Sequence, residues 1–239
     1  MKIGIIVAMQ KEMDRLVSLL SDPREESTCA GRVVRGRMGN HEVAIRQCGI
    51  GKVNAAVGCV ELINTFHPDA VISSGCAGGN GDALQVQDVV VSTEATYHDV
   101  YCGTAVDNCT VYGQVQGLPA RYAAAPALLE HAKTLSAHLR SLHSSLTLHA
   151  GLVVSGDWFV DTKAKMRDIV SHFPEAVAVD MESAAIAQTC YLYKVPFISF
   201  RVISDIPLRD TDASQYHEFW DTVADRSFQV TKSFVELIQ

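Results

Sequence analysis

The chain has 239 residues, of which 48 % are hydrophobic and 20 % are charged, which is typical of a globular protein with a sizeable core. The formal net charge is −7 and basic residues are scattered, which argues against a nucleic-acid partner and favours a small-molecule ligand. Seven cysteines lie apart without a Cys-x-x-Cys pair, so neither a disulfide framework nor a zinc ribbon is indicated.

The N-terminal third alternates between strand and helix patterns. The apolar start, Met1 to Met9, is too short to span a membrane and lacks a small-residue cleavage site. We therefore expect a buried first strand at 3–8, no membrane association and a cytoplasmic location. The pattern then predicts a helix at 11–20, a polar turn at 22–27, a hairpin at 31–39, a strand at 43–47, a helix at 53–66 and a strand at 70–74.

The same alternation continues to the C-terminus. It predicts a strand at 88–92, an irregular stretch at 96–121, a helix at 126–142, a strand at 146–155, a helix at 163–173, a strand through Val177 and Val179, a helix from Ser183, a strand at 196–203 and a final helix at 215–237. Repeated βα units indicate an α/β protein. No linker, repeat or low-complexity tract divides the sequence, so we expect one domain over residues 1–239.

Two carboxylates, Asp180 and Glu182, lie at the predicted junction between the strand through Val179 and the helix from Ser183. Junctions of this kind are where open α/β folds bind ligands. One acid is sufficient to cap the helix, and the alternative interpretation is that either residue does only that. A second acid in apolar surroundings carries a desolvation cost that capping does not offset, which favours a functional role.

Two glycine clusters follow predicted strands. The segment from Gly49 to Asn54 is a weak dinucleotide-binding signal, because Asn54 stands where the fingerprint needs its last glycine. The second cluster, 75–79, follows the strand at 70–74 and is expected to let the backbone approach a ligand closely at the C-terminal end of that strand. The alternative is a tight turn without a ligand.

Acids also end two further predicted strands. Ser204 and Asp205 follow the strand at 196–203, whose Arg201 is expected to be buried. Burial is expected to make Asp205 a proton donor, although an Asx turn or a helix N-cap is an alternative interpretation. Glu12 follows the first strand in the same topological position as Glu182. We therefore expect Glu12, Glu182 and Asp205 to converge on one crevice.

One cluster has the chemistry of metal ligands. It comprises His98, Cys102 and Cys109, all in the irregular stretch at 96–121. Loop residues of this kind are more often solvent-facing than metal-bound, so we predict that no metal is bound.

Together these motifs resemble the 5′-methylthioadenosine/S-adenosylhomocysteine nucleosidases of the nucleoside phosphorylase superfamily. The resemblance covers nearly the whole chain, and its motifs are Ile3-Gly4-Ile5-Ile6 with Ala8-Met9 and Glu12, Gly49-Ile50-Gly51-Lys52-Val53, Gly75-Cys76-Ala77-Gly78-Gly79, Val154-Ser155-Gly156-Asp157 with Phe159, Met181-Glu182 and Ser204-Asp205. It implies a three-layer α/β fold with a mixed, partly closed sheet. It also implies a homodimer that needs no cofactor and that hydrolyses the N-glycosidic bond of adenine thionucleosides in methionine salvage.

The resemblance also implies a role for each motif residue. Glu12 is similar to the general base that activates water, and Asp205, oriented by Ser204, to the acid that protonates adenine at N7. The remaining residues implied to bind the substrate are Met181 and Glu182 at the ribose, Phe159 and the Val160 backbone at adenine, and Met9, Cys76, Ala77 and Gly78. The chain departs from the family where Cys76 replaces a serine or threonine, where Asp180 replaces a glutamate, and in a longer loop at 100–118 that is implied to close the partner subunit's pocket.

Three alternative functions remain. A phosphorylase of the same superfamily needs a phosphate clamp, but no arginine lies at 71–74, and Arg46, inside a predicted strand, is expected to pair structurally. A futalosine-type hydrolase shares the two acids but takes a different 5′ substituent. A non-catalytic nucleoside sensor would need neither Glu12 nor Asp205, so their joint presence argues against it.

Overall fold

The computed structural model describes the whole chain except residues 29–30, 104–110, 142–146, 210–213, 223–225 and 239. The strands are β1 (Lys2–Val7), β2 (Ser21–Thr28), β3 (Gly31–Met38), β4 (His41–Gln47), β5 (Ala70–Gly79), β6 (Val89–Tyr97), β7 (Tyr122–Ala123), β8 (Leu148–Ser155), β9 (Ala176–Asp180) and β10 (Phe197–Asp205). The helices are α1 (Gln10–Val17), α2 (Lys52–Phe66), α3 (Pro126–Ser141), α4 (Lys163–His172), α5 (Ser183–Tyr193), α6 (Ser214–Thr222) and α7 (Arg226–Leu237).

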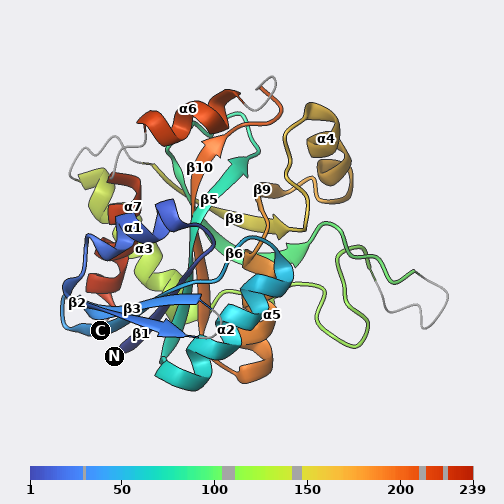
Figure 1. Cartoon of the computed structure of the whole chain (residues 1–239). Helices are drawn as coiled ribbons and strands as arrows, with labels where there is room; N and C mark the ends of the chain where they lie inside the picture. Colours follow the sequence, from blue (N-terminus) through green and yellow to red (C-terminus); the bar gives the residue numbers. More distant parts are fainter. Residues whose placement is uncertain (29–30, 104–110, 142–146, 210–213, 223–225, 239) are drawn as a thin grey trace.

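All ten strands belong to one mixed sheet that is partly closed (Figure 1). The strand order is β10-β6-β8-β9-β5-β1-β4-β3-β2, and β5 also pairs with β10. This extra pairing joins β10, β6, β8, β9 and β5 into a ring, while β1, β4, β3 and β2 extend from it as an open sheet. The expected three-layer fold with a mixed, partly closed sheet is therefore confirmed.

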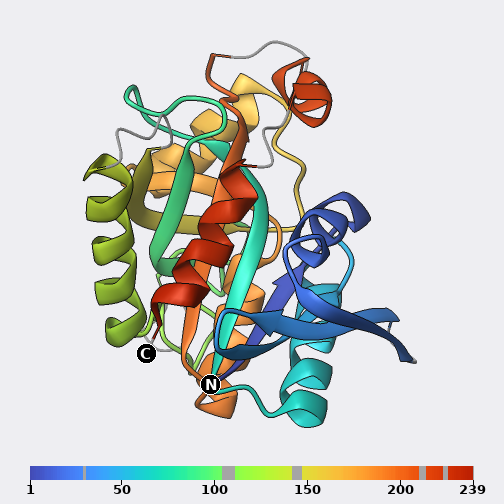
Figure 2. The ribbon, with the colours of Figure 1, turned by 90° about the vertical axis from the view of Figure 1, so that its left-hand side faces the viewer.

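Helices cover both faces of the sheet (Figures 1 and 2). One face carries α2 and α5, whose buried side chains, including Cys59 and Ile186, pack against Ile6 and Val71. The other face carries α1, α3 and α7, which bury a larger cluster that includes Phe234. Apolar side chains thus cover both faces of the central strands, which explains why β1 lacks a polar alternation.

The prediction that the strand from residue 70 ends at residue 74 is wrong, because residues 75–79 also belong to it. These residues complete β5, where they pair with β10 and, at Gly78 and Gly79, with β9. Within the strand, position 75 needs a glycine, because a Cβ there would lie 2.4 Å from Arg201 Nη1 and 2.7 Å from Glu12 Oε1. The glycines are therefore needed for close approach of side chains rather than for a turn.

Two other element predictions are wrong in part. Residues 22–27 belong to β2, whose side chains are mostly exposed, so the strand lacks the apolar alternation that would reveal it. Ion pairs from Arg32 to Glu25 and from Arg35 to Glu26 tie this edge strand to β3. The single helix expected at 215–237 is two helices, α6 and α7, with residues 223–225 outside the described part of the chain.

None of the helices within the described residues is both long and apolar enough to cross a membrane. Part of the loop at 100–118, residues 104–110, lies outside the described residues, as does Cys109.

Candidate active site

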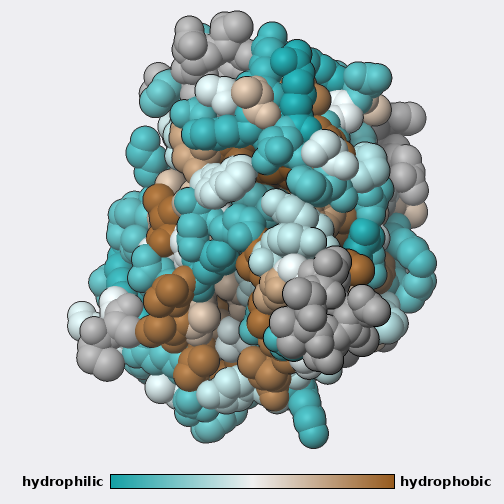
Figure 3. Space-filling view, turned by 90° about the vertical axis from the view of Figure 1, so that its right-hand side faces the viewer, coloured by the Kyte–Doolittle hydropathy of each residue, from teal (hydrophilic) through white to brown (hydrophobic). Residues whose placement is uncertain are grey.

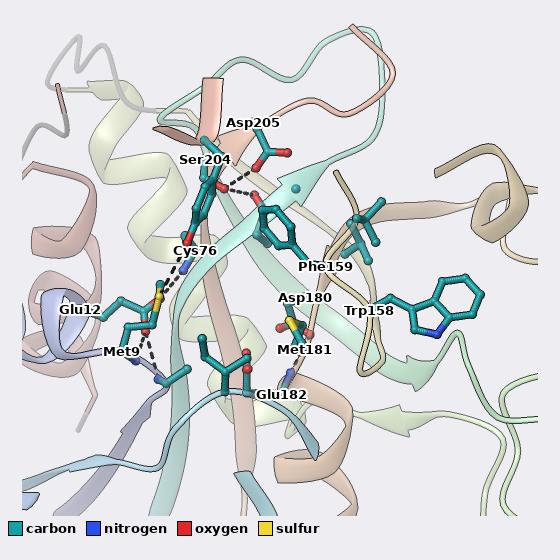
Figure 4. A pocket seen from close by; sticks show the side chains of 17 residues that line it. Met9, Glu12, Cys76, Trp158, Phe159, Asp180, Met181, Glu182, Ser204 and Asp205 are labelled. Atoms are coloured by element: carbon teal, nitrogen blue, oxygen red, sulfur yellow. Dashed lines mark hydrogen bonds between the residues drawn. The ribbon is translucent and has the colours of Figure 1, made fainter. Parts of the chain in front are cut away.

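A pocket opens where several strands of the sheet end, and it gathers every residue that the sequence indicated (Figure 4). Its volume is about 600 Å³, including the open space at its mouth. The lining residues are Ala8, Met9, Glu12, Ile50, Cys76, Ala77, Gly78, Trp158, Phe159, Val160, Val179, Asp180, Met181, Glu182, Ser204, Asp205 and Tyr216. Four of them are carboxylates, and no lysine or arginine is among them.

Glu12 lies in the first turn of α1, with its carboxylate turned back toward the end of β1. Its Oε2 accepts hydrogen bonds from the backbone amides of Ala8, at 3.0 Å, and Met9, at 2.9 Å. Its Oε1 accepts one from the Cys76 amide of β5, at 2.9 Å. Burial raises the pKa of Glu12 above its usual value, and this effect exceeds the opposing effects of Arg201 and the amides. The result is a fixed carboxylate that holds a proton more readily than a free one.

The carboxylates of Asp180 and Glu182 have different contacts, so only one of them acts as the helix cap that the sequence allowed for either. Asp180 Oδ1 accepts hydrogen bonds from Ser155 Oγ at 2.5 Å and from the Glu182 amide at 3.3 Å, while its Oδ2 accepts one from Ser183 Oγ at 2.5 Å. Asp180 therefore caps α5 and anchors it to β8. Glu182 makes no cap hydrogen bond to α5 and turns into the pocket, where its Oε1 accepts from the Gly51 amide at 2.9 Å.

The buried position of Glu182 also changes the pKa of its carboxyl group. Burial raises its pKa to about 7, with further contributions from the negative charges of Asp180 and Glu12, and Arg201 opposes this rise. A carboxylate with such a pKa changes charge near neutral pH, which is typical of functional sites.

Arg201 lies beneath the pocket and is the cation of this acidic cluster. It is 1 % exposed, and its Nε lies 2.6 Å from Asp180 Oδ2 and 3.0 Å from Ser183 Oγ. Its Nη2 donates to Ser73 Oγ at 2.6 Å, and its Nη1 lies 4.0 Å from Glu182 Oε2. The sequence marked this arginine only as buried. Its position in β10, opposite Gly75 of β5, brings it between three of the four acids.

Ser204 and Asp205 end β10 on the far side of the pocket. The pairing of β10 with β5 shifts register between Ile203 and Asp205, and such bulges commonly redirect side chains beside binding sites. Ser204 Oγ lies 2.6 Å from Asp205 Oδ1 and 3.2 Å from the Ala77 carbonyl oxygen. A hydroxyl that donates to Oδ1 fixes the orientation of the carboxyl group, which lines the pocket.

An aromatic wall, which we define as Trp158, Phe159 and Tyr216, borders the carboxylates (Figure 4 shows Trp158 and Phe159). The rings of Phe159 and Tyr216 meet edge to face at 5.1 Å between centroids. Tyr216 Oη lies 3.8 Å from the sulfur of Met9. Apolar rings of this size suit the flat face of a nucleobase and an uncharged substituent.

Sequence reasoning missed five of the lining residues: Ala8, Ile50, Trp158, Val179 and Tyr216. Ile50 and Trp158 lie inside motifs that were recognised, so their proximity to the motif residues was a usable signal. Tyr216 reaches the pocket from α6, and nothing in its local sequence distinguishes it from other aromatic residues.

His98 contradicts the expectation that this loop residue faces solvent. It is 2 % exposed, and its ring packs edge to face on Trp158 at 5.2 Å. Burial lowers the pKa of its imidazole. The described residues contain no group of three or more histidine, cysteine, aspartate or glutamate side chains that could hold a metal ion.

Arg46 pairs structurally, as expected. Its Nη2 lies 2.5 Å from Glu61 Oε2, and its Nη1 donates a hydrogen bond to Thr28 Oγ1 at 2.8 Å.

Comparisons with known proteins identify the family to which the chain is similar. The family model described as the phosphorylase superfamily matches residues 2–236. A 5′-methylthioadenosine/S-adenosylhomocysteine nucleosidase of Exiguobacterium sp. is 39 % identical over 239 residues, covering 100 % of this chain and 99 % of the relative. The corresponding protein of Geobacillus thermodenitrificans is 40 % identical over 240 residues, covering 100 % and 98 %.

Solved structures are similar over almost the full length. The nucleosidase of Neisseria meningitidis in complex with methylthio-immucillin-A has a TM-score of 0.89 and 36 % identity, covering 98 % of each chain. The nucleosidase of S. pneumoniae with the transition-state inhibitor MT-ImmA has a TM-score of 0.90 and 33 % identity, covering 100 % of each chain.

Proposed function

The chain belongs to the 5′-methylthioadenosine/S-adenosylhomocysteine nucleosidases of the phosphorylase superfamily, and we propose that Glu12, Glu182 and Asp205 divide the chemistry of this hydrolysis. The enzyme hydrolyses the N-glycosidic bond of 5′-methylthioadenosine and S-adenosylhomocysteine, which gives adenine and the free thioribose sugar. As adenine departs, the sugar gains positive charge. Carboxylates near the ribose therefore stabilise the transition state more than the substrate.

The proposed roles follow from the position of each acid. Glu12 takes a proton from the attacking water, and its three amide contacts support this role because they hold the carboxylate in place. Asp205, oriented by Ser204, gives a proton to N7 of adenine, so that a neutral base leaves. Glu182 accepts hydrogen bonds from the ribose hydroxyls beside Met181, and the Phe159 ring and Val160 backbone hold adenine. Met9, Cys76, Ala77 and Gly78 complete the substrate contacts.

The charge of the pocket lining supports water rather than phosphate as the nucleophile. The described lining of the pocket contains four carboxylates and no lysine or arginine. Arg201 and Arg46, the buried arginines, are already engaged by Asp180 and Glu61. An incoming phosphate would meet negative charge without the clamp that phosphate sites use. A phosphorylase is therefore the less favourable assignment.

The test is to incubate the protein with a panel of adenine nucleosides that differ at the 5′ position, with and without phosphate, and to identify the sugar product by mass. We expect free sugar from the methylthio and homocysteinyl compounds, with no effect of phosphate. Phosphate-dependent turnover to a sugar 1-phosphate would contradict the assignment. Cleavage of futalosine in preference to both thionucleosides would make the futalosine-type hydrolase correct instead.

The assembly is a further part of the proposal. We infer a cytoplasmic homodimer formed through α2 and α5, whose outer surface exposes Val53 and Val57 on α2 and Tyr191, Leu192 and Tyr193 on α5. The side of the molecule in Figure 3 has hydrophobic surface in its lower half. A group of exposed apolar side chains on two neighbouring helices is typical of an interface between subunits.

The mass in solution tests the dimer. Light scattering should give twice the mass of the 239-residue chain, and Leu192→Asp should shift the mass toward that of the monomer. A wild-type monomer at micromolar concentration would contradict the dimer.

A further inference from the structure

Helix α2 begins beside the pocket without a cap of its own. Its N-cap residue is Gly51, which has no side chain to accept a hydrogen bond, and its first turn contains no acidic residue. Two carboxylates from elsewhere in the chain accept hydrogen bonds from the first amides of the helix. Glu182 Oε1 accepts from the Gly51 amide at 2.9 Å, and Asp157 Oδ1 accepts from the Lys52 amide at 2.8 Å. The start of α2 is thus joined both to the proposed ribose carboxylate and to the loop that carries Phe159.

The side chain of Lys52 strengthens the second connection. Its Nζ lies 2.7 Å from Asp99 Oδ2 and 3.7 Å from Asp157 Oδ2. The same oxygen of Asp99 accepts a hydrogen bond from the Asp157 amide at 2.8 Å. Lys52 also lies over the Tyr97 ring, 5.6 Å from its centroid. Three loops, which follow β4, β6 and β8, therefore meet at one ammonium group.

Two glycines make this meeting possible. Gly51 has φ +95°, and a Cβ there would lie 2.9 Å from Asp157 Oδ1. A Cβ at Gly156 would lie 2.4 Å from the His98 ring and 2.8 Å from the Asp99 carboxyl carbon. Any larger residue at either position would force the loops apart, so the close approach is built into the backbone.

We propose that Lys52, Asp99 and Asp157 form a positioning clamp that holds the loop at 156–160, and with it the adenine-binding side of the pocket, at a set distance from Glu182. The three residues act through Phe159, Val160 and Glu182, and none of the three lines the pocket. The inference rests on the proposed function, since it takes the 156–160 loop as the nucleobase contact.

The side chains of Lys52 and Asp99 are more buried than those of an ordinary surface ion pair. Exposed pairs contribute little because water and side-chain entropy offset them. The side chain of Asp99 is only 9 % exposed and that of Lys52 24 %. The Asp99 oxygen that the lysine contacts also accepts a hydrogen bond from the Asp157 amide, so the lysine fixes the carboxylate that holds the loop backbone. A displacement of about 1 Å in a substrate-positioning group can cost about 10²-fold in rate.

The experiment compares Lys52→Met with Lys52→Arg and with Lys133→Met, a matched control that removes a lysine from an exposed pair with Glu130 on α3. We expect Lys52→Met to raise KM for 5′-methylthioadenosine about 10-fold or more while kcat changes less, because Glu12 and Asp205 keep their own contacts. Lys52→Arg should recover most of this loss, and Lys133→Met should behave as the wild type.

A spectroscopic measurement separates positioning from loss of structure. The chain has two tryptophans, Trp158 and Trp220. In a Trp220→Phe background, emission therefore reports on Trp158 alone, and Lys52→Met should increase its quenching by acrylamide several-fold without a matching fall in Tm. Wild-type KM and wild-type quenching in Lys52→Met would overturn the clamp.

Asp99→Asn decides the question where Lys52→Met fails to fold, since the amide keeps an acceptor for the Asp157 amide but removes the charge. It should raise KM and quenching in the same direction, and an unchanged KM would overturn the clamp. Failure of the proposed function is distinguishable, because a wild-type chain that cleaves no adenine nucleoside would contradict that function while the fluorescence comparison still tests the clamp.

Discussion

The two sides of the pocket are held in different ways. The acidic floor, which we define as Glu12, Asp180, Glu182, Asp205 and Arg201, consists of side chains that are at most 7 % exposed. The aromatic wall is partly open, with Trp158 38 % exposed and Phe159 46 % exposed. Floor residues lie within strands or just after them, and most are fixed by hydrogen bonds from other elements. Wall residues lie on a loop and on α6 and are held by ring contacts.

This difference separates chemistry from recognition. Groups that must act on a transition state need fixed positions, and a buried hydrogen-bonded floor provides them. Groups that bind flat or apolar parts of a substrate tolerate more movement, because apolar contact is not directional. We therefore expect floor substitutions to act mainly on kcat and wall substitutions mainly on KM.

The largest effect on the floor other than at Glu12 is expected at Asp205. Asp205→Asn keeps a hydrogen-bonding group but cannot deliver an acidic proton, so kcat for adenine nucleosides should fall by about 10²- to 10⁴-fold. Steady-state turnover and a thermal melt of the same sample check this. A variant that melts much earlier but keeps its activity per folded molecule would show that Asp205 only terminates β10.

Glu182 should affect binding and turnover together. Glu182→Gln replaces charge-assisted hydrogen bonds to the ribose, each contributing about 1.5–3 kcal/mol, with neutral ones. Both KM and kcat should therefore worsen, with kcat/KM down by about 10- to 100-fold, as tenfold corresponds to about 1.4 kcal/mol. Kinetics with 5′-methylthioadenosine measure this, and a near-normal kcat/KM would leave Glu182 no role beyond its hydrogen bond to the start of α2.

The pH dependence should also come from the floor. The pKa of Glu12 is raised and that of Glu182 is raised to about 7, both by burial, and the proposed roles need both carboxylates ionised. Activity is therefore present above about pH 7 and is lost as pH falls through the raised values, at up to about tenfold per pH unit for one proton. A profile of kcat/KM between pH 5 and pH 9 checks this. In Glu182→Gln, the loss of activity at acidic pH should be smaller. An unchanged loss would mean that another group than Glu182 causes it.

The smallest effect is expected on the wall. Phe159→Leu keeps an apolar side chain but loses ring contacts, including the one with Tyr216, which typically contribute about 0.5–1.5 kcal/mol beyond buried area. KM should rise several-fold with kcat nearly unchanged, as measured with 5′-methylthioadenosine. A large fall in kcat alone would place the wall in the chemistry and remove the distinction between the two sides.

Sequence reasoning reached the floor more completely than the wall. Glu12, Glu182 and Asp205 each follow a strand with a clear apolar pattern, and the topology of a parallel sheet brings such ends together. Arg201 was seen only as buried, because its partners come from β5, β9 and α5 and depend on strand order. Tyr216 could not be predicted as a lining residue, since its position depends on how α6 packs over the end of β10.

The misjudged elements have the same physical origin. β2 is held by exposed charged pairs to β3, so its sequence reads as a polar turn. The glycines at 75–79 read as the end of a strand, but they continue β5, and Gly75 leaves the space that Arg201 and Glu12 occupy. In both places long-range contacts outweigh the local preference of the sequence.

The most direct test of the division between floor and wall is to measure rate and affinity together in Glu12→Gln. The amide keeps the shape of the pocket but cannot accept the proton of the attacking water, and a positioned general base typically contributes about 10²- to 10⁴-fold. We expect kcat to fall by this amount while a non-hydrolysable analogue of 5′-methylthioadenosine binds as well as to the wild type, or more tightly. Affinity and rate that fall together would contradict it, since Glu12 would then serve binding or packing and the base would have to be another residue.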